Sequence, residues 1–422
     1  MRILLVNKFH YRRGGSEAYY FALAEGLRSK GHEVACFSMQ DDRNLPCEQA
    51  RYFVSPREYD KPASLTQRLG SATSLIYSRE AKRKFDALCR EFRPDVIHLN
   101  LVHRQISFSI LDAPAAQGIP VVYTAHDYVL VCPAYTMLDG GGAVCDDCLD
   151  GHFMHCARKR CVKSSLAKSA LAVAEAEFLR RHGSYGKVGL FIAPSVFMRD
   201  KLVEGGIPAH KVVAMQNFAP DDLMERAGGA GDATDRTHPY LLFFGRLSHE
   251  KGVELLVRAF LAVLPSLPGD WSLVIAGDGP RRDALLELLG EAQGADHVRL
   301  VGSKSGDELR RLVRQASFAV VPSVWRENMP YSIIEAFAQG TPVIGTRIGG
   351  IPELVMGGRT GCSCEAGDVG SLAQAIGRAT SMDVTDYRHM QAACREYVLT
   401  RCDQATYISD LVGRYGRLRA GG

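Results

Sequence analysis

Short apolar runs alternate with longer amphipathic stretches along most of the chain. In the first half, strand-like runs occupy residues 2–7, 32–38, 94–100, 119–127 and 190–195, and a helix-like stretch at 16–30 follows the first run. In the second half, the strand-like runs are 239–247, 271–279, 298–302, 317–323 and 341–346, and the helical patterns between them are 252–264, 281–289, 307–315 and 330–339. This alternation is typical of parallel β-sheets covered by α-helices.

Residues 220–238 interrupt this rhythm. The stretch is rich in Gly and Asp and has no sustained apolar period, so we interpret it as a linker. A chain of 422 residues is also too long for one ordinary core. The sequence therefore predicts two α/β, Rossmann-like domains, 1–219 and 239–399. Ligands of such sheets bind at the carboxyl ends of the strands, and we expect these ends to face each other across a cleft.

The composition excludes several classes of protein. Hydrophobic residues make up 46% and charged residues 23%, as in soluble globular proteins. No apolar run reaches the roughly 18–20 residues that span a bilayer, and the first residues do not resemble a signal peptide, so we expect a cytoplasmic protein. The net charge of +4 is small and no known nucleic-acid-binding module is present, so we expect no nucleic acid partner.

Three strand-to-helix loops carry Gly or cationic residues. In "NKFHYRRGGSEAYY", Gly14 and Gly15 allow a backbone to approach a ligand at a helix start, although Ser16 as an ordinary N-cap also explains the pattern. In "FFGRLSHEKG", Arg246 and Lys251 form a cation pair that suits a diphosphate. In "IAGDGPRR", Gly277 fits a ligand-facing turn as well as an ordinary one.

The stretch "RENMPYSIIEAFAQG" holds two carboxylates eight residues apart. Pro330 suits the first position of a helix, so Glu327 lies in the preceding loop and Glu335 within the first two turns. Both acids can bind hydroxyl groups of one ligand, and the helix N-terminus between them suits a phosphate. Carboxylates that bind pairs of hydroxyls indicate a sugar ligand.

With these motifs in order, the chain resembles the GT-B glycosyltransferases, specifically the large retaining family 4. The resemblance covers nearly the whole sequence and includes "GGSE", "TAHD", "FFGRLSHEKG" and "PSVWRENMPYSIIEAFAQGTPVIGTRIGGIPELV". It implies a GT-B fold, an enzyme of the hexosyltransferase class, and a last segment, 400–422, that returns to the N-terminal domain. The loop reads "ENMP" where many members have an "EGFG" type, which leaves the donor sugar open.

The resemblance also implies roles for individual residues, all as donor ligands or catalytic groups. Arg246 and Lys251 would hold the diphosphate, Glu327 would bind donor-sugar hydroxyls, and Glu335 would bind the ribose. Backbone groups of Asn328 and Met329 would assist Glu327, and Ser303 would lie near the base. Gly15 would contact the diphosphate, and His126 would contact the sugar near the reacting centre, unless it is a core histidine.

No Asp-x-Asp metal pair sits at a suitable strand end, so we expect the cations and the helix N-terminus to neutralise the leaving group without a metal. The expected donor is a UDP- or GDP-sugar, and the expected acceptor is a growing, lipid-linked polysaccharide. Two alternatives stay open, a nucleotide-sugar epimerase on the same fold and a catalytically silent sugar-nucleotide-binding scaffold.

Five cysteines cluster within residues 132–161, at Cys132, Cys145, Cys148, Cys156 and Cys161. A Cys-x2-Cys pair is a common zinc half-site, so the spacing favours a structural Zn²⁺, with free thiols and redox or Fe–S chemistry as alternatives. The resemblance places a similar insert in family members linked to exopolysaccharide assembly.

Basic residues are concentrated in the first half, where 29 Lys and Arg stand against 22 Asp and Glu. Basic residues cluster at 158–168 and at 79–84, and the second cluster lies in a stretch with apolar residues, 75–88. A basic amphipathic helix can contact the inner face of an anionic membrane. A solvated helix face explains the same pattern.

Overall fold

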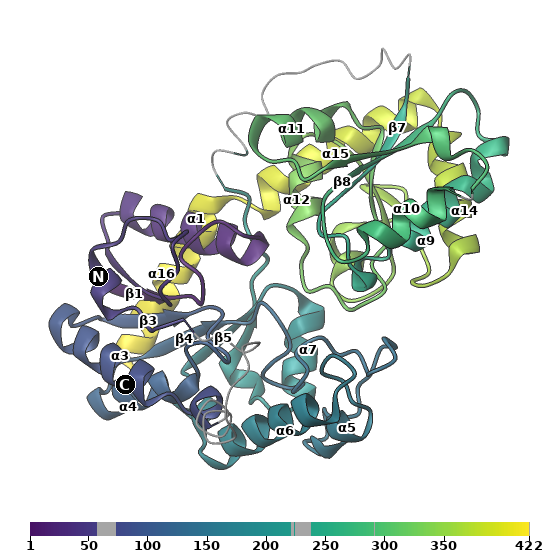
Figure 1. Cartoon of the computed structure of the whole chain (residues 1–422). Helices are drawn as coiled ribbons and strands as arrows, with labels where there is room; N and C mark the ends of the chain where they lie inside the picture. Colours follow the sequence, from purple (N-terminus) through teal and green to yellow (C-terminus); the bar gives the residue numbers. More distant parts are fainter. Residues whose placement is uncertain (57–72, 221–222, 224–237, 291, 422) are drawn as a thin grey trace. The chain divides into compact units, whose positions relative to one another are not determined.

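The computed structural model describes residues 1–56, 73–220, 223, 238–290 and 292–421 (Figure 1). The chain forms two compact units. Unit 1 comprises Met1–Gln216 and Gln404–Gly422, and unit 2 comprises Asn217–Asp403. The predicted linker, residues 220–238, lies largely outside the described residues.

Unit 1 is built on a sheet of six parallel strands in the order β2-β1-β3-β4-β5-β6. Its central strands are almost wholly buried, as expected for a parallel sheet with helices on both faces. From β1 the chain first adds β2 on one side and then adds β3 on the other side of β1. The direction of winding therefore reverses between β1 and β3. The strands are β1 (Arg2–Val6), β2 (Glu33–Phe37), β3 (Val96–Leu99), β4 (Val121–Thr124), β5 (Leu190–Ala193) and β6 (Val212–Ala214).

The helices of unit 1 cover this sheet, and several begin at side-chain caps. Ser78, Ser165 and Ser195 each accept a hydrogen bond from a backbone N–H three residues later, which fixes where α3, α6 and α7 begin. The α-helices are α1 (Gly15–Ser29), α3 (Arg79–Phe92), α4 (Asp112–Gln117), α5 (Met154–Arg158), α6 (Leu166–Arg181), α7 (Val196–Glu204) and α16 (Gln404–Ala420), and the 3-10 helices are η1 (Glu48–Tyr52), η2 (Phe108–Leu111), η3 (Ser184–Lys187) and η4 (Ala209–Lys211).

The C-terminal helix α16 packs beside α1, although the two lie at opposite ends of the chain (Figure 1). Gly26 of α1 provides the close approach, because a Cβ there would stand 2.9 Å from Nε2 of Gln404. The hydroxyl groups of Tyr19 and Tyr407 are 2.7 Å apart, and Tyr415 bonds the buried His98 of β3. The end of the chain is thus part of the core of unit 1.

Helix α3 carries the basic cluster at 79–84, and its apolar face is not available to a membrane. Phe85 and Leu88 lie in the core of unit 1, and the rings of Phe37 and Phe85 meet edge to face at 4.9 Å. On the polar face, Lys82 pairs with Asp112 at 3.0 Å. The prediction of a membrane-binding helix is wrong for this segment, because amphipathicity does not reveal that the protein itself covers the apolar face.

Unit 2 repeats the architecture with a parallel sheet in the order β12-β11-β10-β7-β8-β9. Here the winding reverses between β7 and β10. The pattern of apolar residues predicts five of these strands, but β12 escapes it because the sequence Gly-Cys-Ser-Cys lacks β-branched residues. The strands are β7 (Tyr240–Phe244), β8 (Ser272–Ala276), β9 (Val298–Gly302), β10 (Phe318–Val321), β11 (Val343–Thr346) and β12 (Gly361–Cys364).

The helices of unit 2 bury aliphatic and aromatic side chains against both faces of its sheet. Among the described residues, no helix in either unit is long and apolar enough to cross a membrane. The α-helices of unit 2 are α9 (Val253–Val263), α10 (Arg282–Gly290), α11 (Gly306–Gln315), α12 (Tyr331–Ala338), α13 (Ile351–Leu354), α14 (Val369–Thr380) and α15 (Val384–Arg401), and its 3-10 helices are η5 (His249–Lys251), η6 (Leu264–Ser266) and η7 (Ala295–His297).

Candidate active site

The candidate site of unit 2 lies where the winding of its sheet reverses. The loop after β7 ends at Lys251, and the loop after β10 contains Glu327. Because β7 and β10 are neighbours in the sheet, their carboxyl ends lie side by side. Such a reversal leaves a crevice between the two loops, which is where open α/β sheets bind their ligands.

Lys251 and Glu327 form an ion pair across this reversal point. Nζ of Lys251 donates to Oε1 of Glu327 at 2.5 Å, and Oγ of Ser323 donates to the same oxygen at 2.8 Å. Glu327 is only 4% exposed, so the two donors compensate a carboxylate that has lost most of its water. Both of these hydrogen bonds involve Oε1.

Two glycines let the loops pack closely enough to form this pair. Gly252 has φ +67°, and a Cβ there would stand 2.0 Å from the carbonyl oxygen of Pro322. Gly349 has φ +60°, and a Cβ there would stand 2.3 Å from the carbonyl oxygen of Glu327. The N–H of Gly350 also donates to that oxygen at 2.7 Å. The Glu327 loop is thus held between the loops that follow β7 and β11.

The Arg246 loop is held from its other side by the loop after β8. A Cβ at Gly277 would stand 1.9 Å from the carbonyl oxygen of Gly245, and Leu247 donates its N–H to the carbonyl of Asp278 at 2.9 Å. The side chain of Arg246 is exposed. Gly277 therefore positions the cation-bearing loop through a backbone contact, which requires a residue without a side chain.

The remaining predicted residues of unit 2 lie on α12, in the loop before it and after β9. Glu335 is half-buried in the second turn of α12, and burial raises the pKa of its carboxyl to about 7 against the opposing field of Arg310. Met329 is buried, and its Sδ lies 3.0 Å from the backbone N of Asn217. Asn328 is half-buried in the loop before α12, and Ser303 is exposed after β9.

The sequence predicted that Pro330 is the first helical residue of α12. In the structure it is the N-cap, one position earlier. Within the part of the chain that the structure describes, neither Ser303 nor Glu335 hydrogen-bonds the Lys251–Glu327 pair. Of the predicted residues of unit 2, Lys251 and Glu327 are thus in direct contact, whereas Ser303 and Glu335 are not bonded to this pair.

In unit 1, Gly14 and Gly15 lie exposed at the start of α1. Gly14 is the N-cap, so Ser16 stands inside the first turn and the alternative of a Ser16 cap is wrong. Glu17 is buried behind this turn and accepts from Nδ2 of Asn7 at 3.5 Å. The helix N-terminus therefore has exposed backbone at its tip.

His126 lies directly after β4 and is neutral. Its Nε2 is 3.0 Å from Oδ1 of Asn100, and the Tyr19 ring meets it edge-on at 5.0 Å. Burial lowers the pKa of His126 to about 3. Because Nδ2 of Asn100 donates to the carbonyl of Val6 at 3.3 Å, Oδ1 faces the imidazole. Nε2 then carries the hydrogen, which leaves Nδ1 as a hydrogen-bond acceptor.

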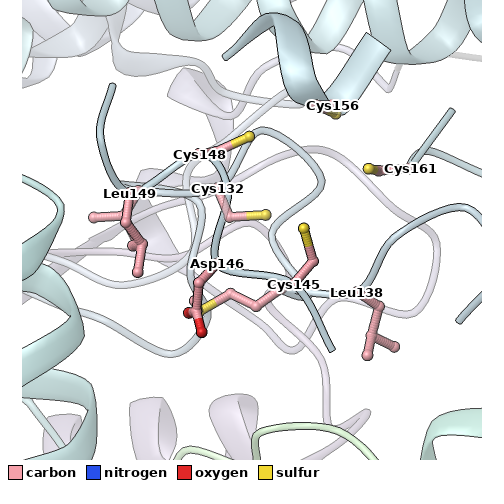
Figure 2. Close-up of a pocket in the computed structure, with 10 residues that line it drawn as sticks. Cys132, Leu138, Cys145, Asp146, Cys148, Leu149, Cys156 and Cys161 are labelled. Carbon is pink, nitrogen blue, oxygen red and sulfur yellow. The ribbon is translucent and has the colours of Figure 1, made fainter. Parts of the chain in front are cut away.

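The five cysteines of the insert line one small cavity of about 10 Å³, and Figure 2 shows their side chains around a common space. All are free thiols. Burial raises the pKa of Cys132 to about 11 and that of Cys148 to about 12, which keeps both sulfurs protonated.

Within the described residues, no group of three or more His, Cys, Asp or Glu side chains is arranged to hold a metal ion. The predicted structural zinc is therefore not supported.

Comparison with known proteins places these features in a family. A model described as "Glycosyltransferase Family 4" matches residues 13–223, and one described as "Glycosyl transferases group 1" matches residues 238–381. The first of these covers half of the chain. The protein belongs to glycosyltransferase family 4. It is a glycosyltransferase enzyme, and its two parallel-sheet units are those of the GT-B fold.

Individual relatives agree with this assignment. A glycogen synthase of Mycobacterium tuberculosis is 36% identical over 161 residues, which is 37% of this chain and 38% of that protein. The match with this relative thus spans well under half of its length. An uncharacterized 42.6 kDa protein in the cps region of Klebsiella pneumoniae is 24% identical over 367 residues, which is 84% of this chain and 87% of that protein.

Among solved structures, Anabaena HepE in complex with UDP aligns with a TM-score of 0.66 at 18% identity and covers 99% of this chain and 100% of its own. At this identity, the likeness concerns the fold alone.

Sequence reasoning missed three residues that support the family 4 motifs. Ser323 ends a predicted strand and hydrogen-bonds Glu327, Gly349 supports the Glu327 backbone, and Asn100 orients His126. Ser323 and Asn100 each stand at the end of a predicted strand, which is a signal for a ligand-side position. Gly349 gives no such signal, because its partner lies on another loop.

Proposed function

We propose that the protein is a retaining, metal-independent hexosyltransferase that moves a sugar from a UDP- or GDP-sugar to a growing, lipid-linked polysaccharide. The observation that carries this proposal is the ion pair between Lys251 and Glu327 at the reversal point of unit 2, with Arg246 on the same loop as Lys251. A sugar nucleotide requires both a carboxylate for sugar hydroxyls and cations for a diphosphate, and this arrangement supplies both.

In the proposed reaction, the bond between the anomeric carbon and the donor phosphate oxygen breaks. The acceptor oxygen forms its bond to the anomeric carbon on the same face, and its proton passes to an oxygen of the departing diphosphate. Lys251 and Arg246 neutralise the charge that develops on this leaving group, which is the work that a metal ion does in other transferases.

The other predicted residues orient the donor. Oε2 of Glu327 accepts from sugar hydroxyls while Oε1 stays with Lys251 and Ser323. Asn328 and Met329 assist through their backbone, Glu335 accepts from the ribose, and Ser303 lies near the base. From unit 1, Gly14 and Gly15 bind the diphosphate. Neutral His126 accepts a hydrogen bond from a sugar hydroxyl at its Nδ1.

The acceptor side of the proposal rests on different observations. The segment 154–168 combines exposed apolar side chains, Met154 and Leu166, with the exposed cations Arg158, Arg160 and Lys163. Exposed apolar and basic groups together suit the inner face of an anionic membrane, where a lipid-linked acceptor would be presented.

The test is donor consumption by the full chain with a panel of UDP- and GDP-sugars, in EDTA, with a membrane extract as acceptor source. We expect one donor to be consumed, with retention of the anomeric configuration in the product. Consumption that depends on an added divalent ion would contradict metal independence. If nucleotide sugars bind but none is consumed, the protein is a scaffold, and conversion of the donor to an isomer without transfer would make it an epimerase.

A further inference from the structure

A second reversal point, in unit 1, carries charged groups to which neither the family motifs nor the proposed roles give a function. Lys8 follows β1, Arg104 follows β3 and Asp127 follows β4. These three strands are neighbours in the order β1-β3-β4, so their carboxyl ends form one edge. The winding of the sheet reverses between the first two, where ligands of such sheets bind.

Two cations at this edge lie against the ring of Phe9. Nζ of Lys8 lies 5.1 Å from the centre of that ring, and the guanidinium carbon of Arg13 lies 4.6 Å from it. Lys8 is half-buried and Arg13 is exposed. Within the described part of the chain, no carboxylate stands at ion-pair distance from either cation. A half-buried ammonium without a direct counter-ion is costly unless a ligand supplies one.

Arg104 is held in place by the cysteine-bearing insert. Its Nη2 donates to the carbonyl of Pro133 at 3.4 Å, and its guanidinium carbon lies 5.2 Å from the centre of the Tyr135 ring. Both Arg104 and Tyr135 have positive φ, +66° and +59°. Non-glycine residues in this region are strained, and such strain is concentrated at ligand sites. The insert thus contacts Arg104 at both Pro133 and Tyr135.

Acidic groups lie nearby and offset part of the charge of Arg104. Glu175 is 8% exposed and reaches Arg104 only at 4.0 Å, and burial raises the pKa of Glu175 to about 7. Burial likewise raises the pKa of Asp127 to about 6. Burial, then Arg104 and Arg13, lower the pKa of Lys8 to about 8, and the two arginines outweigh the opposing acids, Asp127 and Glu17. Next to burial, the two arginines are thus the largest influence on the pKa of Lys8.

We propose that Lys8, Arg13 and Arg104 form a binding subsite for an anionic group, a phosphate or a carboxylate. The inference rests on the proposed function for the source of this anion. It is either the diphosphate of the sugar nucleotide or an acidic group of the acceptor, such as the diphosphate of a lipid carrier or a uronic acid.

Binding of inorganic pyrophosphate to the full chain, measured by calorimetry at pH 7, tests the subsite. An Arg246→Gln, Lys251→Met background removes the two cations of the candidate site in unit 2, so the loss of binding in a further unit 1 variant reports on unit 1. In this background we expect Lys8→Met and Arg104→Gln each to weaken pyrophosphate binding about tenfold or more, and Lys8→Arg to retain it. Arg43→Gln is the matched control, because Arg43 lies over Tyr11 in the same unit but is already paired with Asp41 at 2.8 Å.

The proposal is overturned if the background protein binds no pyrophosphate, or if Lys8→Met and Arg104→Gln bind it as tightly as Arg43→Gln does. Thermal melts of each variant establish that a loss of binding is not a loss of fold. A competition experiment that compares the unaltered chain with Lys8→Met then separates the two sources, because the part of the pyrophosphate binding that depends on Lys8 reports on unit 1. If saturating UDP or GDP displaces pyrophosphate from unit 1, the anion is the donor diphosphate, and if neither does, it belongs to the acceptor. Since these titrations require no turnover, a chain that binds pyrophosphate but transfers no sugar would refute the proposed function and leave the subsite standing.

Discussion

Lys251 and Glu327 are 76 residues apart in the sequence, yet Nζ of the first lies 2.5 Å from Oε1 of the second. The pair joins the loops that follow two adjacent strands, β7 and β10. Each residue thereby orients the other, so a change in one is expected to displace both the carboxylate and the ammonium.

Glu327→Gln will lower kcat at least about 100-fold, because the amide cannot hold Lys251 and sugar hydroxyls as a carboxylate does. Rates are measured with the donor that the panel identifies. Glu308→Gln is a suitable control, since Glu308 also pairs with a lysine, Lys304, at 2.6 Å, but on the exposed face of α11. Wild-type kcat in Glu327→Gln would remove this residue from the site.

Gly349→Ala will lower activity about 100-fold, because its Cβ would meet the carbonyl oxygen of Glu327 at 2.3 Å and displace the loop that carries the carboxylate. Gly358→Ala is the control, because it introduces the same backbone strain as Gly349→Ala without a steric clash. Gly358 also has positive φ, +80°, but a Cβ added there would meet nothing within 4 Å. Both variants will lose about 1–2 kcal/mol from the conformation itself. Only the first will lose catalysis, and equal activity in the two would contradict the role of the close contact.

Donor affinity will depend on pH through Glu335, whose pKa burial raises to about 7. The ionised carboxylate is the form that accepts hydrogen bonds from ribose hydroxyls, so we expect Kd for the nucleotide to fall as pH rises from 6 to 8. In Glu335→Gln this dependence should vanish. Calorimetric titration of UDP and GDP at three pH values measures both. A pH-independent Kd in the unaltered protein would argue against contact between Glu335 and the nucleotide.

The raised pKa of Glu335 also makes the free energy of unfolding depend on pH. Because the folded carboxyl binds its proton more tightly than the unfolded one, unit 2 retains more protons than the unfolded chain between about pH 4.5 and 7. The contribution of Glu335 to the free energy of unfolding is therefore present below pH 4.5 and is lost as pH rises through 7. Denaturant titrations across this range should show a shallower decline in Glu335→Gln than in the unaltered protein. Parallel curves would contradict the raised pKa.

Gly26→Val will loosen the C-terminal helix. A Cβ at Gly26 would stand 2.9 Å from Gln404 and 3.0 Å from Ile408, so overpacking should cost about 1–3 kcal/mol. Gly416→Val provides the control on α16, because nothing lies within 4 Å of that position. Hydrogen exchange over residues 404–420 should increase in the first variant alone. Unchanged protection there would mean that α16 does not depend on this contact.

The sequence predicts much of this arrangement because parallel strands impose a strong pattern. Arg246, Lys251 and Glu327 were expected near one another, since the ends of parallel strands share one edge of a sheet. The short strand β6 and the polar strand β12 were missed, because neither has a long apolar run. The glycine contacts were not predictable, since a residue without a side chain leaves no sign of the distant backbone that it admits.

The membrane-binding helix and the structural zinc failed as predictions for a common physical reason. The cluster at 79–84 lies on an amphipathic helix, and the five cysteines do surround one cavity. What a linear pattern cannot supply is the surrounding protein. In the first case the core of unit 1 occupies the apolar face, and in the second no group of three or more side chains among the described residues is arranged to hold a metal ion.

Because the backbones after β7, β10 and β11 touch at Gly252 and Gly349, these loops are interlocked. If one of these loops were grafted from another transferase to change the sugar that is delivered, its side chains would clash with the other loops wherever the contact leaves no room for a Cβ. An engineer who wishes to alter the specificity of this protein should exchange the three segments together, or vary only residues that point away from their shared contacts.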